Sequence, residues 1–175
     1  MGGINLSNRT IGIIILILII ITGVFAFINR EMVKDNREAH ENAEIIIKGE
    51  GSETKLSFED IANLGEEEFT AVLDTSDSDP KEHSYTGVPL VNIIEKVGIN
   101  IEDKKQVIVR GIDGYTIALN SKEAMDKDNV YLVYKLNGKF LKGKEEGGSG
   151  PYQIIVRKDE FSQRWCKFVV EMEVK

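Results

Sequence analysis

The stretch "YTGVPLVNIIEKVG", residues 85–98, carries the clearest local signal in the chain. Pro89 suits the first turn of a helix, because proline lacks the N–H that would be unpaired there. Gly98 suits the end of the helix, since glycine tolerates the left-handed conformation found there. Between them, apolar residues recur at helical spacing: Leu90, Ile93, Ile94 and Val97. The stretch therefore predicts a short amphipathic helix that packs on a core.

Short apolar or alternating runs flank this helix and predict β-strands. Ser57, with Asp60 three residues later, marks the start of another short helix. Asp113-Gly114 and Asn137-Gly138 are typical of hairpin turns. The strand-like runs are "EIIIKG" (44–49), "EFTAVLD" (68–74), "QVIVRGIDGYTIAL" (106–119), "VYLVYKLNGKFL" (130–141), "YQIIVR" (152–157) and "RWCKFVVEMEV" (164–174). Many short strands with few short helices predict an α+β or mainly β domain.

Near the amino terminus, the chain carries an apolar segment at residues 11–28. Its 18 residues include no charge, and at about 1.5 Å per residue they extend about 27 Å, enough to cross a bilayer. We expect an uncleaved transmembrane helix or signal anchor. A secretory signal cleaved near "VFA", residues 24–26, is the alternative.

We expect four parts along the chain: a tail at 1–10, the span at 11–28, a polar stalk at 29–43 and a compact domain at 44–175. Three cations follow the span and Arg9 precedes it, which by the positive-inside rule favours a cytoplasmic carboxyl terminus. A short tail before one apolar helix is, however, built like a signal sequence. We prefer a single-pass protein of the cell membrane whose domain is extracytoplasmic.

The charge distribution limits the partners of the domain. All 29 acidic residues follow residue 30, whereas two of the 22 basic residues precede residue 31. The part after the span is therefore more acidic than the net charge of −7 for the whole chain suggests. Such a surface argues against nucleic acid as a partner. The single cysteine, Cys166, excludes an internal disulfide and any site built from several cysteines.

Five stretches together resemble the molybdopterin-binding domain of the sulfite-oxidase family. They lie in the family's order between Tyr85 and Val174. The resemblance implies an α+β fold with curved, mainly antiparallel sheets and short helices. In complete members of that family, the domain holds a pterin-bound molybdenum that exchanges oxygen atoms or electrons with a small substrate. The stretches are "YTGVPLVNIIEKVG", "DGYTIAL", "VYLVYKLNG", "GSGPYQIIV" and "RWCKFVVEMEV".

Two departures from the family pattern bear on activity. In catalytic members a cysteine thiolate holds the molybdenum, and the matching positions here are 74–76, within "LDTSD". The family's arginine after a Gly-Pro pair is replaced by Gln153. A hydroxyl or carboxylate is a poor substitute for a soft thiolate, and an amide cannot replace a guanidinium group. We therefore expect no catalytic residue, no metal ligand and no cofactor, although the resemblance leaves molybdopterin possible.

The family's arrangement also indicates which residues would lie near the former cofactor cleft. Several of them are explained equally well as core or rim residues. They are Tyr85, Arg110, Tyr115, Tyr152, Gln153, Arg164 and Trp165.

Other features of the sequence have plainer interpretations. The acidic loop after residue 73 either binds a hard cation or, as we prefer, is a solvated loop, because its spacing matches no EF-hand. The run 143–151 is either an anion-binding nest or a flexible connection. Alternation from Trp165 places Cys166 on the apolar side of a last strand, as a small core residue. We expect His40 to be exposed in the stalk.

Three functions from different classes remain. The leading hypothesis is a membrane-anchored module that keeps the fold, has lost molybdenum catalysis and binds a protein partner or a small ligand. The second is a molybdopterin-dependent oxidoreductase with non-cysteine metal ligation. The third is a structural subunit of a membrane complex. The leading hypothesis follows from the site, since function resides in specific residues and not in the fold.

Overall fold

The computed structural model describes residues 7–76, 78–101 and 104–175. The chain divides into a unit that ends at Arg37 and a second unit, Glu38–Lys175, called the domain below. Helix α1 (Asn8–Glu41) makes up the described part of the first unit and supplies the first residues of the domain. The stretch from Asn8 to Arg30 contains an 18-residue window with a mean hydropathy of 3.2 and is apolar and long enough to cross a membrane. This finding is consistent with a membrane anchor, and a signal sequence has the same properties.

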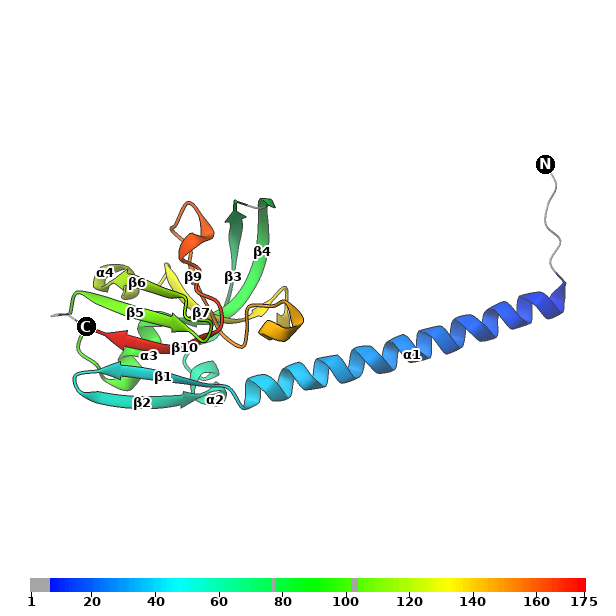
Figure 1. The fold of residues 1–175 in the computed structure, drawn as a ribbon, viewed down its shortest axis with the longest axis horizontal. Helices are drawn as coiled ribbons and strands as arrows, with labels where there is room; N and C mark the ends of the chain where they lie inside the picture. Colours follow the sequence, from blue (N-terminus) through cyan, green and yellow to red (C-terminus); the bar gives the residue numbers. More distant parts are fainter. Residues whose placement is uncertain (1–6, 77, 102–103) are drawn as a thin grey trace. The chain divides into compact units, whose positions relative to one another are not determined.

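The domain contains two five-stranded sheets (Figure 1). In the first sheet, the last strand of the chain lies between the first strand and a strand from the middle of the sequence. Its strands β1 and β10 are parallel, and the other neighbours are antiparallel. In spatial order the strands are β2 (Ser52–Ser57), β1 (Glu44–Gly49), β10 (Val169–Val174), β5 (Gln106–Gly111) and β6 (Thr116–Asn120).

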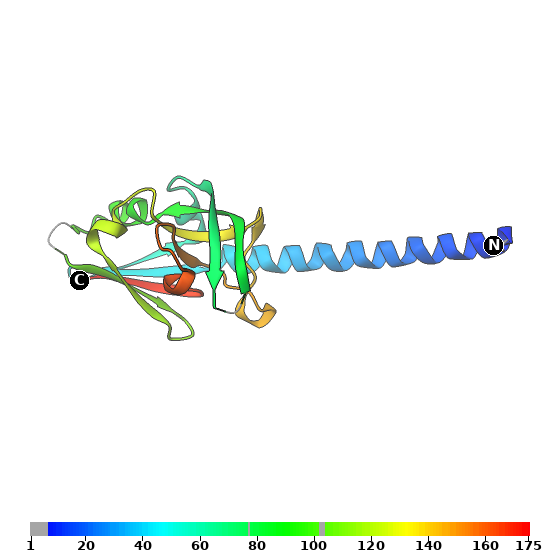
Figure 2. The ribbon, with the colours of Figure 1, turned by 90° about the horizontal axis from the view of Figure 1, so that it is seen from above.

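The second sheet is antiparallel throughout. Strand β9 (Gln153–Val156) pairs with β7. In Figures 1 and 2, β3 and β4 run across the direction of the strands of the first sheet. Sheets that cross in this way enclose a core between their inner faces. The main order is β3 (Glu67–Thr75), β4 (Ser78–Pro89), β7 (Val130–Leu136) and β8 (Lys139–Phe140).

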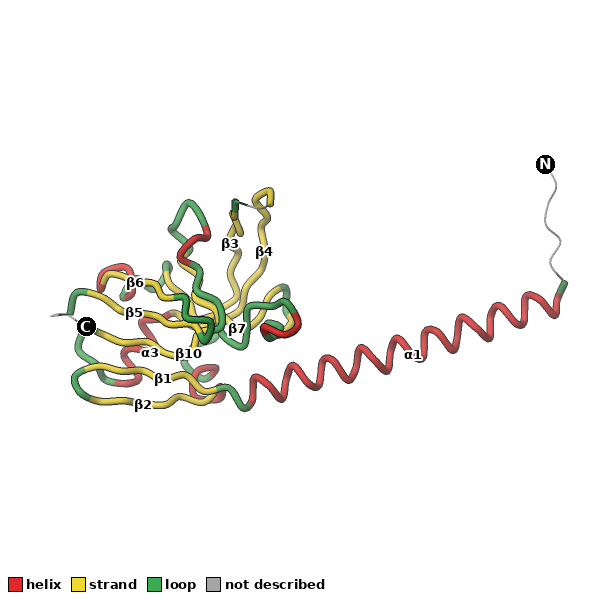
Figure 3. The backbone as a smooth tube through the Cα atoms, in the orientation of Figure 1, coloured by secondary structure: helices red, strands yellow, loops and turns green. Residues whose placement is uncertain are grey.

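The helices of the domain are short beside its strands (Figure 3). Helix α3 (Leu90–Val97) is the predicted amphipathic helix, with Leu90 and Ile93 fully buried and Gly98 at φ 70°. A reciprocal capping box between Ser57 and Asp60 begins the second helix, as the sequence predicts. The remaining helical segments are α2 (Phe58–Ala62), α4 (Ser121–Ala124) and the 3₁₀ turns η1 (Lys144–Glu146) and η2 (Ser162–Arg164). The predicted α+β class is confirmed.

Two local predictions are wrong. The acidic segment after residue 73 is not one long loop, because β4 begins at Ser78 and pairs with β3 through Leu73–Lys81 and Thr75–Ser78. Residues 165–168 do not belong to the last strand. Phe168 has φ 55°, which no strand residue adopts, so both Trp165 and Cys166 are buried in spite of the expected alternation.

His40 is buried, contrary to the prediction that it is exposed. Only 1% of its surface is accessible. Its ring lies 4.6 Å from the ring of Phe140 and 6.1 Å from that of Phe58, measured between centroids. Its Nε2 is 3.1 Å from the carbonyl oxygen of Pro151. The end of α1 is therefore packed into the core of the domain, which begins before residue 44.

The packing of His40 predicts a stability effect. We expect His40→Ala to destabilise the domain by about 2 kcal/mol, because it leaves a cavity and a carbonyl without its partner. Urea unfolding of the full chain in detergent, followed by the fluorescence of Trp165, measures the change. His83→Ala, on the partly exposed face of β4, is the matched control. Equal losses in the two variants would contradict the role given to His40.

Candidate functional site

The end of β3 is the place where the resemblance puts a metal ligand. Here the backbone N–H of Asp74 donates to the hydroxyl of Ser162 over 2.9 Å, and that hydroxyl lies 3.4 Å from the carbonyl oxygen of Val72. Turn η2 therefore lies directly beside β3, as the orange segment in Figure 1 shows. A hollow of about 370 Å³ remains between residues 74–76 and residues 161–163. Carboxylate, hydroxyl, amide and phenyl groups line this hollow.

Tyr85 and Trp165 are brought together in the interior. Their rings meet edge to face with centroids 5.7 Å apart, and Phe69 lies on Tyr85 at 6.1 Å. The indole N–H of Trp165 donates to the carbonyl oxygen of Val156 over 3.2 Å. Burial raises the pKa of Tyr85 to about 12, so its hydroxyl stays protonated. These two residues fill space between β4 and η2.

Tyr152 and Gln153 lie within the core beside β9. Tyr152 is fully buried, and its hydroxyl donates to the carbonyl oxygen of Ala43 over 3.3 Å. Burial raises the pKa of this hydroxyl. Gln153 begins β9 and pairs with Val133 of the neighbouring strand. The position at which the family carries its arginine is thus a buried sheet position.

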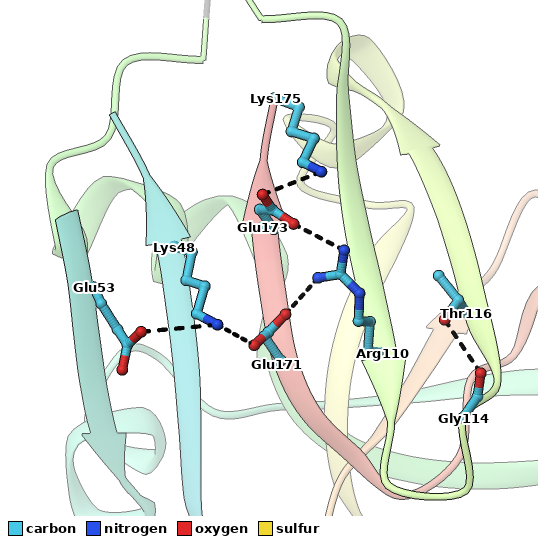
Figure 4. Close-up of polar contacts among 8 residues, drawn as sticks. All are labelled: Lys48, Glu53, Arg110, Gly114, Thr116, Glu171, Glu173 and Lys175. Carbon is cyan, nitrogen blue, oxygen red and sulfur yellow. Dashed lines mark hydrogen bonds and ion pairs between the residues drawn. The ribbon is translucent and has the colours of Figure 1, made fainter. Parts of the chain in front are cut away.

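Arg110 lies on the outer face of the first sheet, in a row of ion pairs that crosses four strands (Figure 4). Its guanidinium donates to Glu171 and, over 2.8 Å, to Glu173. Lys48 pairs with the same Glu171 and lies 3.8 Å from Glu53. Because two carboxylates already bind its guanidinium, Arg110 is not free to bind an anionic cofactor.

Arg164, in turn η2, binds two carboxylates, and Tyr115 binds the main chain of the same turn. Arg164 donates to Asp159 through Nε over 2.8 Å and to Glu123 through a terminal nitrogen over 2.6 Å. These two carboxylates raise the pKa of the guanidinium further, so it is always charged and always paired. The hydroxyl of Tyr115 donates to the carbonyl oxygen of Gln163 over 2.5 Å.

The seven predicted cleft residues therefore do not form one cleft. Tyr85 and Trp165 touch each other, whereas Tyr115 and Arg164 contact other parts of the η2 segment. Arg110 faces outward on the first sheet, and the two residues beside β9 are enclosed by the core.

A groove of about 510 Å³ was not predicted from the sequence. It lies between the outer edge of β3 at residues 70–72 and the segment 157–160, with Glu82 and Asp128 at its sides. The guanidinium of Arg157 lies 5.0 Å from the centre of the Phe69 ring. The charged run "RKDE" at 157–160 is the one sequence signal for this groove, but nothing local shows that it faces β3.

Residues 33–175 match the family model of the oxidoreductase molybdopterin binding domain. The chain belongs to this family. The fold also resembles the sulfane dehydrogenase SoxCD from Paracoccus pantotrophus, with a TM-score of 0.64 and 18% sequence identity over 77% of this chain. The match covers 38% of the SoxCD chain, so this protein spans well under half of it. No curated protein matches the sequence.

The side chains at the positions that the resemblance assigns to the family's ligand do not suit the molybdenum cofactor. Asp74, Thr75 and Ser76 offer no thiolate. Cys166 is fully buried elsewhere, and burial raises the pKa of its thiol to about 12, which keeps it protonated and unsuited to metal binding. Across residues 7–76, 78–101 and 104–175, no three His, Cys, Asp or Glu side chains are grouped to hold a metal ion. No step of a reaction is therefore assigned to a metal here.

The ion-pair row predicts a pH-dependent contribution to stability. Hydrogen bonds from Lys48, and then from Arg110, lower the pKa of Glu171 below its ordinary value of about 4.5. A lowered pKa in the folded state contributes stability above the unfolded pKa, and this contribution is lost as the pH falls through the folded pKa. We expect Glu171→Gln to cost about 1 kcal/mol at pH 7 and progressively less below about pH 4.

Urea unfolding of the full chain at pH 7 and pH 3 tests this expectation. Glu53→Gln is the control, because its side chain is 51% exposed and lies 3.8 Å from Lys48. We expect that variant to be nearly neutral at both pH values. A loss in Glu171→Gln that is as large at pH 3 as at pH 7 would show that the ion pairs are not its cause.

Proposed function

We propose that this protein is a membrane-anchored, extracytoplasmic binding module that keeps the molybdopterin-domain fold without molybdenum catalysis. The observation that carries the proposal is the end of β3. The resemblance assigns the family's ligand to positions 74–76, and there the main chain of Asp74 is hydrogen-bonded to Ser162. At these positions the chain makes a hydrogen bond within the fold and provides no thiolate, the soft ligand that molybdenum would need.

The surrounding charges support the same conclusion. A cofactor that carries anionic groups needs free cations, yet Arg110 and Arg164 are each bound by two carboxylates. Releasing Arg164 would take its cation away from the carboxylates of Asp159 and Glu123. Releasing Arg110 would take one of two cations away from Glu171 and from Glu173. Asp74 would place a further negative charge beside such a cofactor.

Metal analysis of the full chain tests the loss of catalysis. We expect the protein purified in detergent from its native host to contain far less than one molybdenum per chain. We also expect Asp74→Cys to confer no oxidation of sulfite and no reduction of sulfoxides, because the neighbouring arginine is still replaced by Gln153. Near-stoichiometric molybdenum in the unmodified chain would instead support the oxidoreductase.

The apolar helix near the amino terminus supports a membrane anchor. The short tail before it, which is built like a signal sequence, supports a domain outside the cell membrane. Protease added to intact cells, or to spheroplasts where an outer envelope exists, should remove the domain and leave a fragment of α1 in the membrane. A cytoplasmic protein is the control for intact cells. If the protease removes the domain only after the cells are lysed, the domain lies on the cytoplasmic side.

A further inference from the structure

Strand β3 has one unpaired edge. It is the end strand of the second sheet and pairs on one side with β4. The groove of about 510 Å³ runs along its other side, where residues 70–72 face the segment 157–160. An edge strand presents unpaired main-chain groups that can add another strand.

The contacts of Ser162 show which main-chain groups face the groove. Its hydroxyl binds the carbonyl oxygen of Val72 and the N–H of Asp74, away from β4. Main-chain groups on one side of an antiparallel strand recur at every second residue. The N–H and carbonyl groups of Thr70 therefore point the same way as those of Val72. Among the described residues, no loop, turn or side-chain hydrogen bond uses the main chain of Thr70.

The charges around the groove select the chemistry of an added strand. Four carboxylates and two cations line it. Lys158 is bound to Asp126, and Asp159 is bound to Arg164. Within the described parts of the chain, Glu82, Asp128 and Glu160 enter no ion pair, and Arg157 is the remaining cation, over the ring of Phe69. The excess of free carboxylates favours a cationic occupant.

Apolar surface lies beside these charges. The side chain of Val72 is 50% exposed on β3, and Trp165 forms part of the lining. Glu82 is the cross-strand partner of Val72, so the two side chains lie on the same face of the sheet. A lysine or arginine on that face of an added strand can pack its apolar stem on Val72 and place its charge near Glu82.

We propose that the groove binds an extended, lysine- or arginine-rich segment of a partner protein, which pairs with the free edge of β3 around Thr70 and Val72. This inference rests on the proposed function, and it names the class of partner. Main-chain hydrogen bonds supply the pairing, and the carboxylates set the preference for positive charge. The hydroxyl of Ser162 already binds the carbonyl oxygen of Val72 and the N–H of Asp74. The added strand therefore pairs with the N–H and carbonyl groups of Thr70 and with the N–H of Val72, and it ends there.

The probe is a fluorescent peptide of about eight residues in which Lys and Val alternate, titrated with the full chain in detergent. We expect saturable binding that weakens as salt is raised. A Glu–Val peptide of the same length should not bind. A Lys–Val peptide with N-methyl groups on alternate amides should bind about tenfold more weakly, because it has lost the strand-pairing donors.

Variants of the protein test the same edge. Thr70→Pro removes the N–H that faces the groove, whereas Thr70→Ala keeps it and is the matched control. We expect about tenfold weaker binding for the proline variant and a small change for the alanine variant. Glu82→Gln with Glu160→Gln should weaken binding and reduce its salt dependence, while Glu53→Gln on the other sheet should not. Should the proline variant not fold, the methylated peptide tests the pairing on the unaltered protein.

The outcomes separate the inference from the proposed function. Equal affinity for the methylated and unmodified peptides, or no binding of either, would overturn strand addition even if the chain carries no molybdenum. Self-association that Thr70→Pro abolishes would also overturn it, in favour of a second copy of this chain on the edge. Near-stoichiometric molybdenum would overturn the proposed function whatever the peptide does.

Discussion

The parallel pairing of β1 with β10 is the constraint on which the domain depends. It joins Ile46 to Glu171 and Lys48 to Glu173, residues more than 120 positions apart. Without it the first sheet would separate into the hairpin β1–β2 and a three-stranded piece of β10, β5 and β6. The pairing also brings Lys48 into contact with Glu171, so the outer face of the sheet carries a continuous row of ion pairs. A pairing of such long range is formed at a high cost in loop entropy and needs a large core to offset it.

That core extends to the end of α1. The side chains of Ile45 and Ile47 on β1 are buried. His40, which precedes them in the chain, packs on Phe140. The chain is therefore held to the domain before its first strand begins.

The sequence predicts the local features well and the distant contacts poorly. Helix α3 and its left-handed Gly98 follow from spacing and residue type alone. The hairpin at Asn137-Gly138 does so too, with Asn137 at φ 49° and Gly138 at φ 73°. By contrast, nothing in the residues around His40 indicates that an aromatic pair from two other elements encloses it. The same holds for Arg110 and Arg164, whose charge suggests a ligand until their carboxylate partners are known. The partners of Arg110 lie on β10, and those of Arg164 are Glu123 of α4 and Asp159.

The fold of this family and its activity depend on different residues. The fold depends on apolar spacing, turns and strand pairing. By the resemblance, catalysis in complete members depends on a thiolate ligand and an arginine, whose matching positions in this chain are 74–76 and Gln153. Here the main chain of Asp74 makes an ordinary hydrogen bond to Ser162, and Gln153 occupies a buried sheet position, so the packing of the domain requires neither catalytic group. Under the proposed function, the edge of β3 is the surface on which a partner can act, because an edge strand can add another strand.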